Sequence, residues 1–347
     1  MKNILLLCLG LLFLSAQQAD RKTSNHVDAD PLFDVEEALE LTLKTDIDAL
    51  FKDRGDVRDY HPAHVRYKNS AGEMVEVPLK VKVRGNYRRK GGVCKIPPIR
   101  LNFAKTTAEG SIFEGQDKIK LVTHCQRNPP KYAQYLLQEY LIYRVYNQVS
   151  DYSFKTRLVK IRYEDESGKW KPMDTYAFII EDQGKMAERL GGKIKEGYMV
   201  HPTDCHAYQT TLMSVFAYLM GNTDWSIVQQ HNVKLLDREG EMIVPIPYDF
   251  DWSGMVNAPY AIPNPAIFEN LPNVRTRIYR GFEREESLFV QVFETFKQHK
   301  EAIYAIYNDF GPLDKNQKKL SIKYLDSFYK TINDPKLARK NIINRAR

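Results

Sequence analysis

The chain has 347 residues, of which 43% are hydrophobic and 27% are charged, and its formal net charge is +7. This hydrophobic fraction can supply a full core, so the composition excludes a wholly disordered chain. The positive excess is spread over mixed-charge segments, so it allows a phosphate-bearing ligand but does not indicate nucleic acid as a partner.

The first 19 residues have the pattern of a secretory signal peptide. Lys2 precedes an almost unbroken apolar run from Ile4 to Leu14, and small and polar residues follow. An apolar run of about ten residues is too short to span a bilayer, which needs ~20. We therefore predict that 1–19 is removed on export, that the protein is periplasmic or extracellular, and that it has no membrane span. We expect 20–39 to be a disordered linker.

Three cysteines follow the predicted signal peptide: Cys94, Cys125 and Cys205. In an oxidising compartment an odd number suggests one disulfide and one leftover thiol. Cys94 and Cys125 each flank a predicted strand in the same half of the chain, so we predict that these two pair. Two alternatives stay open, namely three buried free thiols and a zinc site built around Cys205 and nearby histidines.

A β-rich segment is predicted over 40–181. Apolar and polar residues alternate strictly in the first of its strands, and the others are short apolar runs bounded by turn residues. The predicted strands are 77–84, 97–103, 118–122, 157–163 and 175–180. A helix is predicted over 129–148, where apolar residues recur at helical spacing.

The segment 182–347 is predicted to be mostly helical. A helix begins near Cys205, two short strands follow at 232–236 and 242–245, and further helices are expected at 284–308 and 315–331. The elements do not alternate as in a Rossmann sheet. Their order predicts an α+β, protein-kinase-like two-lobed fold with an antiparallel-sheet N-lobe and a mostly helical C-lobe.

Carboxylate and amide side chains gather in two predicted loops of this second segment. Asp224 lies at the end of the helix that begins near Cys205, and Asn232 begins the next strand, while Asp249 and Asp251 follow the strand after it. Asn232 and one of these two aspartates are hard oxygen ligands that suit Mg²⁺ or Mn²⁺. A carboxylate such as Asp224 can orient an attacking hydroxyl, so the pattern indicates metal-dependent phosphoryl transfer.

These residues carry a resemblance to a known family. The segments Gly221–Asn232 and Pro247–Asp251 resemble the catalytic loop and metal-binding motif of CotH-type spore-coat kinases and, more distantly, of HipA-type kinases. Arg84–Asn86, followed by the strand Pro97–Phe103, resembles the arginine-glycine-asparagine turn of the CotH family. A closer likeness is to a group of exported, uncharacterised bacterial proteins. The resemblance covers about 78–260.

The resemblance implies ATP with Mg²⁺ or Mn²⁺ as cofactors, and it implies a role for each matching residue. Asp224 would orient or deprotonate the acceptor hydroxyl, and Asn232 with Asp249 or Asp251 would hold the metal. The residues implied to bind the nucleotide are Arg84, Gly85 and Asn86 over its phosphates, Lys120 paired with Glu139, and Glu181 at the end of a hinge against which adenine stacks. Lys120 has no clear counterpart in the family pattern, so Arg100 competes for its role.

The predicted function is therefore an exported ATP- and metal-dependent kinase that phosphorylates an envelope or secreted protein. One alternative is a degenerate kinase-like module that binds or scaffolds, because a bacterial periplasm holds little ATP. Another is a metal-dependent glycosyltransferase, because Asp249 and Asp251 form an Asp-x-Asp motif. Purely structural roles stay open for Asp224 as a turn cap, and for Lys120 and Glu139 as surface residues.

Overall fold

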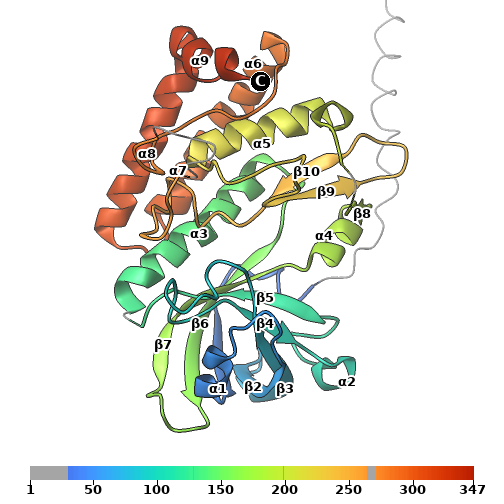
Figure 1. Cartoon of the computed structure of the whole chain (residues 1–347), viewed down its shortest axis with the longest axis vertical. Helices are drawn as coiled ribbons and strands as arrows, with labels where there is room; N and C mark the ends of the chain where they lie inside the picture. The colour runs from blue at the N-terminus through green and yellow to red at the C-terminus, as the bar shows by residue number, and fades with distance from the viewer. Residues whose placement is uncertain (1–29, 128, 198, 264–270) are drawn as a thin grey trace, which may run out of the picture. The chain divides into compact units, whose positions relative to one another are not determined.

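Seven strands close into a barrel (Figure 1). Their bounds are β1 (Leu39–Thr45), β2 (His61–Lys68), β3 (Met74–Val83), β4 (Ile99–Asn102), β5 (Lys118–Val122), β6 (Thr156–Asp165) and β7 (Met173–Ile180). Around the barrel they follow the order β1-β2-β3-β4-β5-β7-β6. The barrel is mixed, because β1 runs parallel to β6 while its other neighbour, β2, is antiparallel.

The computed structural model describes residues 30–127, 129–197, 199–263 and 271–347, so the predicted signal peptide lies outside the described residues. Within this part of the chain, Pro31–Arg347 forms one compact unit. Leu32 and Phe33, which fall in the predicted linker, are buried against the barrel core.

The alternation of side chains explains why β1 belongs to the barrel. Leu39, Leu41 and Leu43 are buried in its interior, while Glu40 and Thr42 between them are more exposed. Successive side chains of a strand point to opposite faces, so this segment has one apolar and one polar face. Asp46 then accepts a hydrogen bond from the backbone N–H of Ala49 and caps the short helix α1 (Ile47–Lys52).

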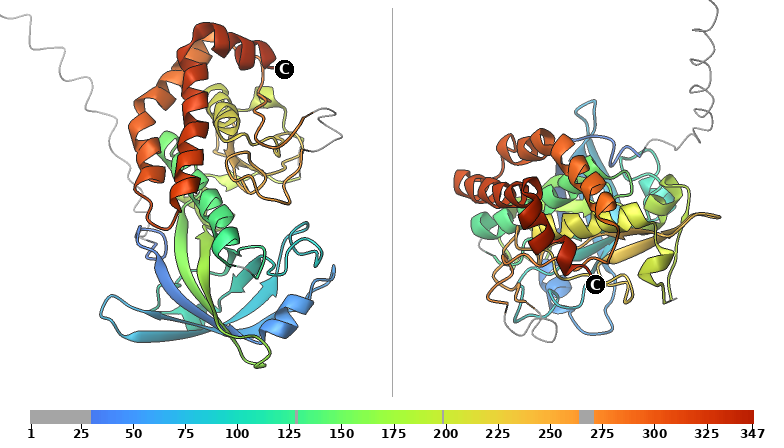
Figure 2. Two further views of the ribbon diagram at one scale, coloured as in Figure 1. Left: turned by 90° about the vertical axis from the view of Figure 1, so that its left-hand side faces the viewer. Right: turned by 90° about the horizontal axis from the view of Figure 1, so that it is seen from above.

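Helices and a small sheet make up the rest of the chain. The helices are α2 (Lys105–Ala108), α3 (Pro129–Val149), α4 (Gln183–Arg189), α5 (Ala207–Met220), α6 (Glu286–Gln298), α7 (Lys300–Asn308), α8 (Lys315–Asn333) and α9 (Pro335–Asn341), with short 3₁₀ turns η1 (Pro202–Asp204) and η2 (Ile343–Arg345). The strands β8 (Lys193–Ile194), β9 (Val233–Asp237) and β10 (Val244–Pro247) form a sheet in the order β10-β9-β8. Figure 2 shows the last helices, orange to red, packed beside one another.

One hydrophobic core joins the barrel strands to these helices. It contains Val122 of β5 and Phe178 of β7 together with Leu137 of α3, Phe216 of α5 and Phe328 of α8. The central helix α3 contacts β6 and β7 along part of its length. Burial of this shared apolar surface is the main force that holds the second half of the chain against the barrel.

The predicted two-lobed, protein-kinase-like fold is wrong. Instead of an antiparallel-sheet lobe the chain forms a closed barrel of mixed strands, and Pro31–Arg347 is one compact unit. The prediction lacked β1 and β2, the two strands that close the barrel through pairing with β6 and β3. The second half also contains a three-stranded sheet beside its helices.

The predicted pairing of Cys94 with Cys125 is confirmed, with the two Sγ atoms 2.05 Å apart, and Cys205 is a buried free thiol. This pairing excludes the alternative of three free thiols. A disulfide is typical of an oxidising, exported environment. None of the described helices is long and apolar enough to cross a membrane.

Candidate functional site

A cavity of about 580 Å³ gathers side chains from three separate loops. The first loop follows β3, the second follows α5 and the third follows β10. Seven of the residues predicted to form the site line it: Arg84, Gly85, Asn86, Asp224, Asn232, Asp249 and Asp251. This cavity is therefore the candidate site.

The loop that carries Asp224 is fixed by local hydrogen bonds. Helix α5 ends at Met220, and the next residue, Gly221, caps it with a φ of 63°, the left-handed conformation that glycine adopts most readily. The side chain of Asn222 then accepts a hydrogen bond from the backbone N–H of Asp224 at 3.0 Å. Further along, Ser226 and His231 exchange two backbone hydrogen bonds of 2.9 Å, which close the loop before β9.

Both carboxylate oxygens of Asp224 have partners in the same loop. Oδ1 lies 2.9 Å from Nε2 of His231, and Oδ2 accepts a hydrogen bond of 3.0 Å from the side-chain amide of Asn232. Because the Asn232 nitrogen is held in this way, the amide oxygen is left to contact a ligand. The hydrogen bond to Asp224 raises the pKa of His231. Sequence reasoning missed His231, although it directly precedes Asn232.

Asp249 and Asp251 differ in their surroundings. Asp249 is half-buried and has a left-handed φ of 63°, and its backbone N–H donates to the hydroxyl of Tyr143 at 2.9 Å. Asp251 is buried and accepts a hydrogen bond of 2.9 Å from the hydroxyl of Tyr260. Burial, and then the charge of Asp249, raise the pKa of Asp251 to about 7.

Cationic side chains lie on or beside the same cavity. Arg84 lines it, and among the described residues its buried Nε has no hydrogen-bond partner. Burial lowers the pKa of Arg84, and the carboxylate of Asp249 opposes this effect. Lys120 lies on β5 with its Nζ 4.8 Å from the ring centre of Tyr248, which also lines the cavity. Burial, and then Arg84, lower the pKa of Lys120 to about 8.

The expected partner of Lys120 has a different contact. Glu139 is buried on α3, and one of its oxygens lies 3.9 Å from Nη1 of Arg88. No ion pair joins Glu139 to Lys120 in the described part of the chain. Arg100, the competing residue, sits opposite Lys120 on the neighbouring strand β4.

The expected hinge at the end of β7 is part of the core. Phe178, Ile179 and Ile180 are buried, and they pair with β5. Glu181 accepts two hydrogen bonds of 2.8 Å from the guanidinium of Arg189. It also accepts one of 2.9 Å from the backbone N–H of Lys155. These contacts give Glu181 a structural role outside the cavity.

The donor set of the cavity suits a hard divalent cation. The amide oxygen of Asn232 and the carboxylate of Asp249 are ligands that Mg²⁺ and Mn²⁺ accept. Among the residues that the structure describes, no group of three or more His, Cys, Asp or Glu side chains is arranged to hold a metal. A cation held here would therefore complete its coordination with oxygens of a bound ligand or of water.

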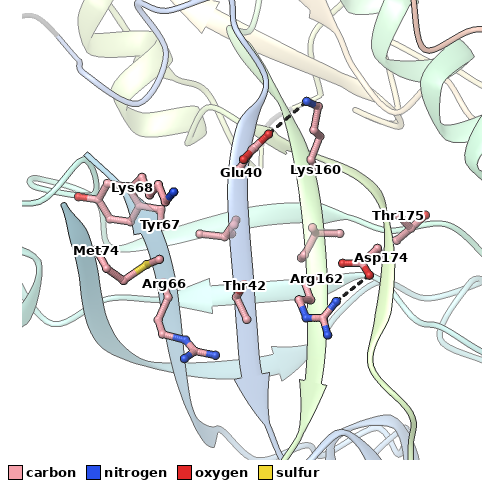
Figure 3. Close-up of a pocket in the computed structure, with 12 residues that line it drawn as sticks. Glu40, Thr42, Arg66, Tyr67, Lys68, Met74, Lys160, Arg162, Asp174 and Thr175 are labelled. Atoms are coloured by element: carbon pink, nitrogen blue, oxygen red, sulfur yellow. Dashed lines mark hydrogen bonds and ion pairs between the residues drawn. The ribbon is translucent and has the colours of Figure 1, made fainter. Parts of the chain in front are cut away.

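A second hollow, of about 520 Å³, lies on the outer face of the barrel (Figure 3). Four of its charged side chains form two pairs, Glu40 with Lys160 at 3.2 Å and Arg162 with Asp174 at 2.7 Å. None of the residues predicted to form the site lines this hollow. The cavity with Arg84 is therefore the better candidate.

Comparison of the chain with family models, with curated proteins and with solved structures finds no match.

Proposed function

We propose that the protein is an exported phosphotransferase that binds a nucleoside triphosphate, ATP in the first instance, with Mg²⁺ or Mn²⁺ in this cavity. Its acceptor would be a hydroxyl group of an envelope or secreted protein. The motifs of the chain that resemble those of CotH-type kinases support this function, whereas the fold of the chain does not. Export is supported by the Cys94–Cys125 disulfide and by the signal-like pattern of the first 19 residues.

The guanidinium of Arg84 is the observation that carries this proposal. Arg84 is half-buried, and its Nε is buried with no hydrogen-bond partner among the described residues. A desolvated donor of this kind in a cavity favours an anionic ligand. Arginine binds phosphate well, because its planar group offers several donors. Asn232 and Asp249 in the same cavity supply oxygen ligands for the cation that accompanies a triphosphate.

The proposed step needs only groups that line the cavity. The acceptor oxygen forms a bond to the γ-phosphorus, and the bond from that phosphorus to the bridging oxygen of ADP breaks. ADP leaves with the electron pair, and the acceptor proton passes to the carboxylate of Asp224. His231 and Asn232 hold that carboxylate in place through the hydrogen bonds described above. When bound, the divalent cation offsets the negative charge of the phosphates.

Two variants separate reaction from binding. Asp224→Ala should lower the rate of phosphoryl transfer by roughly 10²- to 10⁴-fold, because it removes an acid–base group. It should keep the thermal shift that ATP and Mn²⁺ together produce in the wild type. Asp249→Asn should reduce that shift, because it removes a charged ligand while asparagine tolerates the left-handed backbone.

Asp174→Asn is the matched control, because Asp174 lies on the outer face of the barrel and away from this cavity. It should change neither the transfer rate nor the thermal shift. A wild type that shifts with a nucleotide sugar and not with ATP would refute the proposal in favour of glycosyl transfer.

A binding module without transfer is the second candidate, and the contacts of Glu139 favour it. This carboxylate contacts Arg88, and no ion pair within the described ranges holds Lys120 toward a phosphate. In this case the wild type would shift with ATP and Mn²⁺ but would show no transfer to any acceptor. Asp224→Ala would then behave as the wild type does in every assay.

A further inference from the structure

Three charged side chains from distant segments meet where Arg88 and Asp251 line the cavity, and the third is the buried Glu139. Arg88 comes from the loop after β3, Glu139 from the middle of α3 and Asp251 from the loop after β10. Their side chains are only 12%, 3% and 7% exposed, respectively. The charges therefore interact in a medium that screens them poorly.

The guanidinium of Arg88 lies between the two carboxylates. Its Nη1 is 3.9 Å from Glu139 and 3.8 Å from Asp251. Its Nη2 donates to the backbone carbonyl of Thr123, and its Cζ lies 5.8 Å from the ring centre of Tyr260. The hydroxyl of Tyr260 in turn donates to Asp251. Contacts on several sides thus fix the position of the guanidinium.

The charge balance shows what Arg88 does there. Two ionised carboxylates that share a dry site repel each other, and each buried ion costs several kcal/mol without a counter-charge. Burial alone lowers the pKa of Arg88, but Tyr260 and the carboxylates outweigh it, so its pKa rises. Burial also raises the pKa of Glu139. The guanidinium of Arg88 is thus the counter-charge for both Glu139 and Asp251.

A divalent cation could also neutralise Glu139 and Asp251. It cannot do so while the guanidinium of Arg88 occupies the space between these carboxylates. Mg²⁺ requires oxygen ligands at about 2.0 to 2.1 Å, and a guanidinium within 4 Å of both carboxylates would repel it. Asp249 and Asp251 both line the cavity, but Asp249 is half-buried, whereas Asp251 is buried and lies 3.8 Å from Arg88. The two aspartates of the motif therefore stand in different electrostatic settings.

We infer that Arg88 is a positioning residue that takes the place of a cation between Glu139 and Asp251. It holds Asp251 at the wall of the cavity and restricts the divalent cation to Asn232 and Asp249. This inference rests on the proposed use of the cavity by a cation. Asp249 and Asp251 then have different roles. Asp249 is the metal ligand, and Asp251 is the partner of Arg88.

The test counts Mn²⁺ ions bound per chain by equilibrium dialysis, with Mn²⁺ alone as the probe. Arg88→Met keeps an unbranched apolar stem but removes the charge, so the two carboxylates should bind one ion more than the wild type does. Arg88→Lys retains a cation and should match the wild type. Near-ultraviolet circular dichroism would establish that each variant is folded.

An unchanged count in folded Arg88→Met would overturn the inference. If that variant does not fold, Glu139→Gln decides, because it leaves the pair of Arg88 and Asp251 intact and should bind as many ions as the wild type. A lower count would make Glu139 a metal ligand and would refute the inference. Failure of the proposed function is recognised separately, by a wild type that binds neither ATP nor a nucleotide sugar.

Discussion

His124 is a buried imidazole next to the disulfide-bonded Cys125. It is 1% exposed, and among the described residues neither ring nitrogen has a hydrogen-bond partner. Burial, and then the nearby charge of Arg88, lower the pKa of His124 to about 4. The imidazole is therefore neutral in the folded protein at any pH above that value, whereas in the unfolded chain it binds a proton near pH 6.5.

This difference predicts a loss of stability in mild acid. Between pH 6.5 and about 4 the unfolded chain binds more protons at His124, so the folded state loses stability as the pH falls through this window. The loss from this residue should reach about 2 kcal/mol at pH 5. His124→Phe should remove that part of the pH dependence. Urea unfolding of both proteins at pH 7.5 and pH 5 would measure it, and an equal loss in the two would contradict the assignment.

The residues of the cavity were predictable to different degrees. Asp224 and Asn232 share one loop, and Asp249 and Asp251 share another, so the residue types and their spacing in sequence indicated them. Tyr260 and Arg88 reach Asp251 only through tertiary packing. A tyrosine and an arginine in loops carry no sequence signal for such a role, and neither was predicted.

At the scale of elements, local patterns predicted the strands and helices better than the pairing between them. The strand 118–122 and the helix 129–148 were predicted almost to their observed ends, because turn residues bound the strand and a pair of prolines begins the helix. β1 and β2 were missed. The pairing of Leu43 in β1 with Tyr163 in β6 joins residues far apart in the chain, and no periodicity reports such a contact.

The closing strand β1 can be tested through its two faces. Leu43 is completely buried in the barrel interior, so Leu43→Ala should lower the free energy of unfolding by roughly 2 to 5 kcal/mol. Lys44, the next residue, is exposed, and Lys44→Ala should change it by no more than about 0.5 kcal/mol. Urea titrations give both values. Similar small effects of the two variants would show that β1 is not part of the core.

At the scale of the whole molecule, the shared core predicts how the chain unfolds. Val122 and Phe178 of the barrel belong to the same cluster as Phe216 and Phe328 of the helices. Separation of the two halves would expose this apolar surface to water, at a cost that grows with the area exposed. A chain with two independent lobes would have no such link. We therefore expect Pro31–Arg347 to unfold as one cooperative unit.

The three tryptophans of the chain allow unfolding to be followed separately in different parts of the molecule. Trp170 packs against the barrel core and Trp225 belongs to a core of the second half, whereas Trp252 packs against the core that the barrel and the helices share. A variant with Trp225→Phe and Trp252→Phe retains only the barrel reporter, and Trp170→Phe retains only the other two. Within each variant, the urea midpoint from tryptophan emission should equal that from far-ultraviolet circular dichroism, because both follow one transition. A barrel reporter with a midpoint of its own would show that the halves unfold independently, and the shared core would then contribute little to their association.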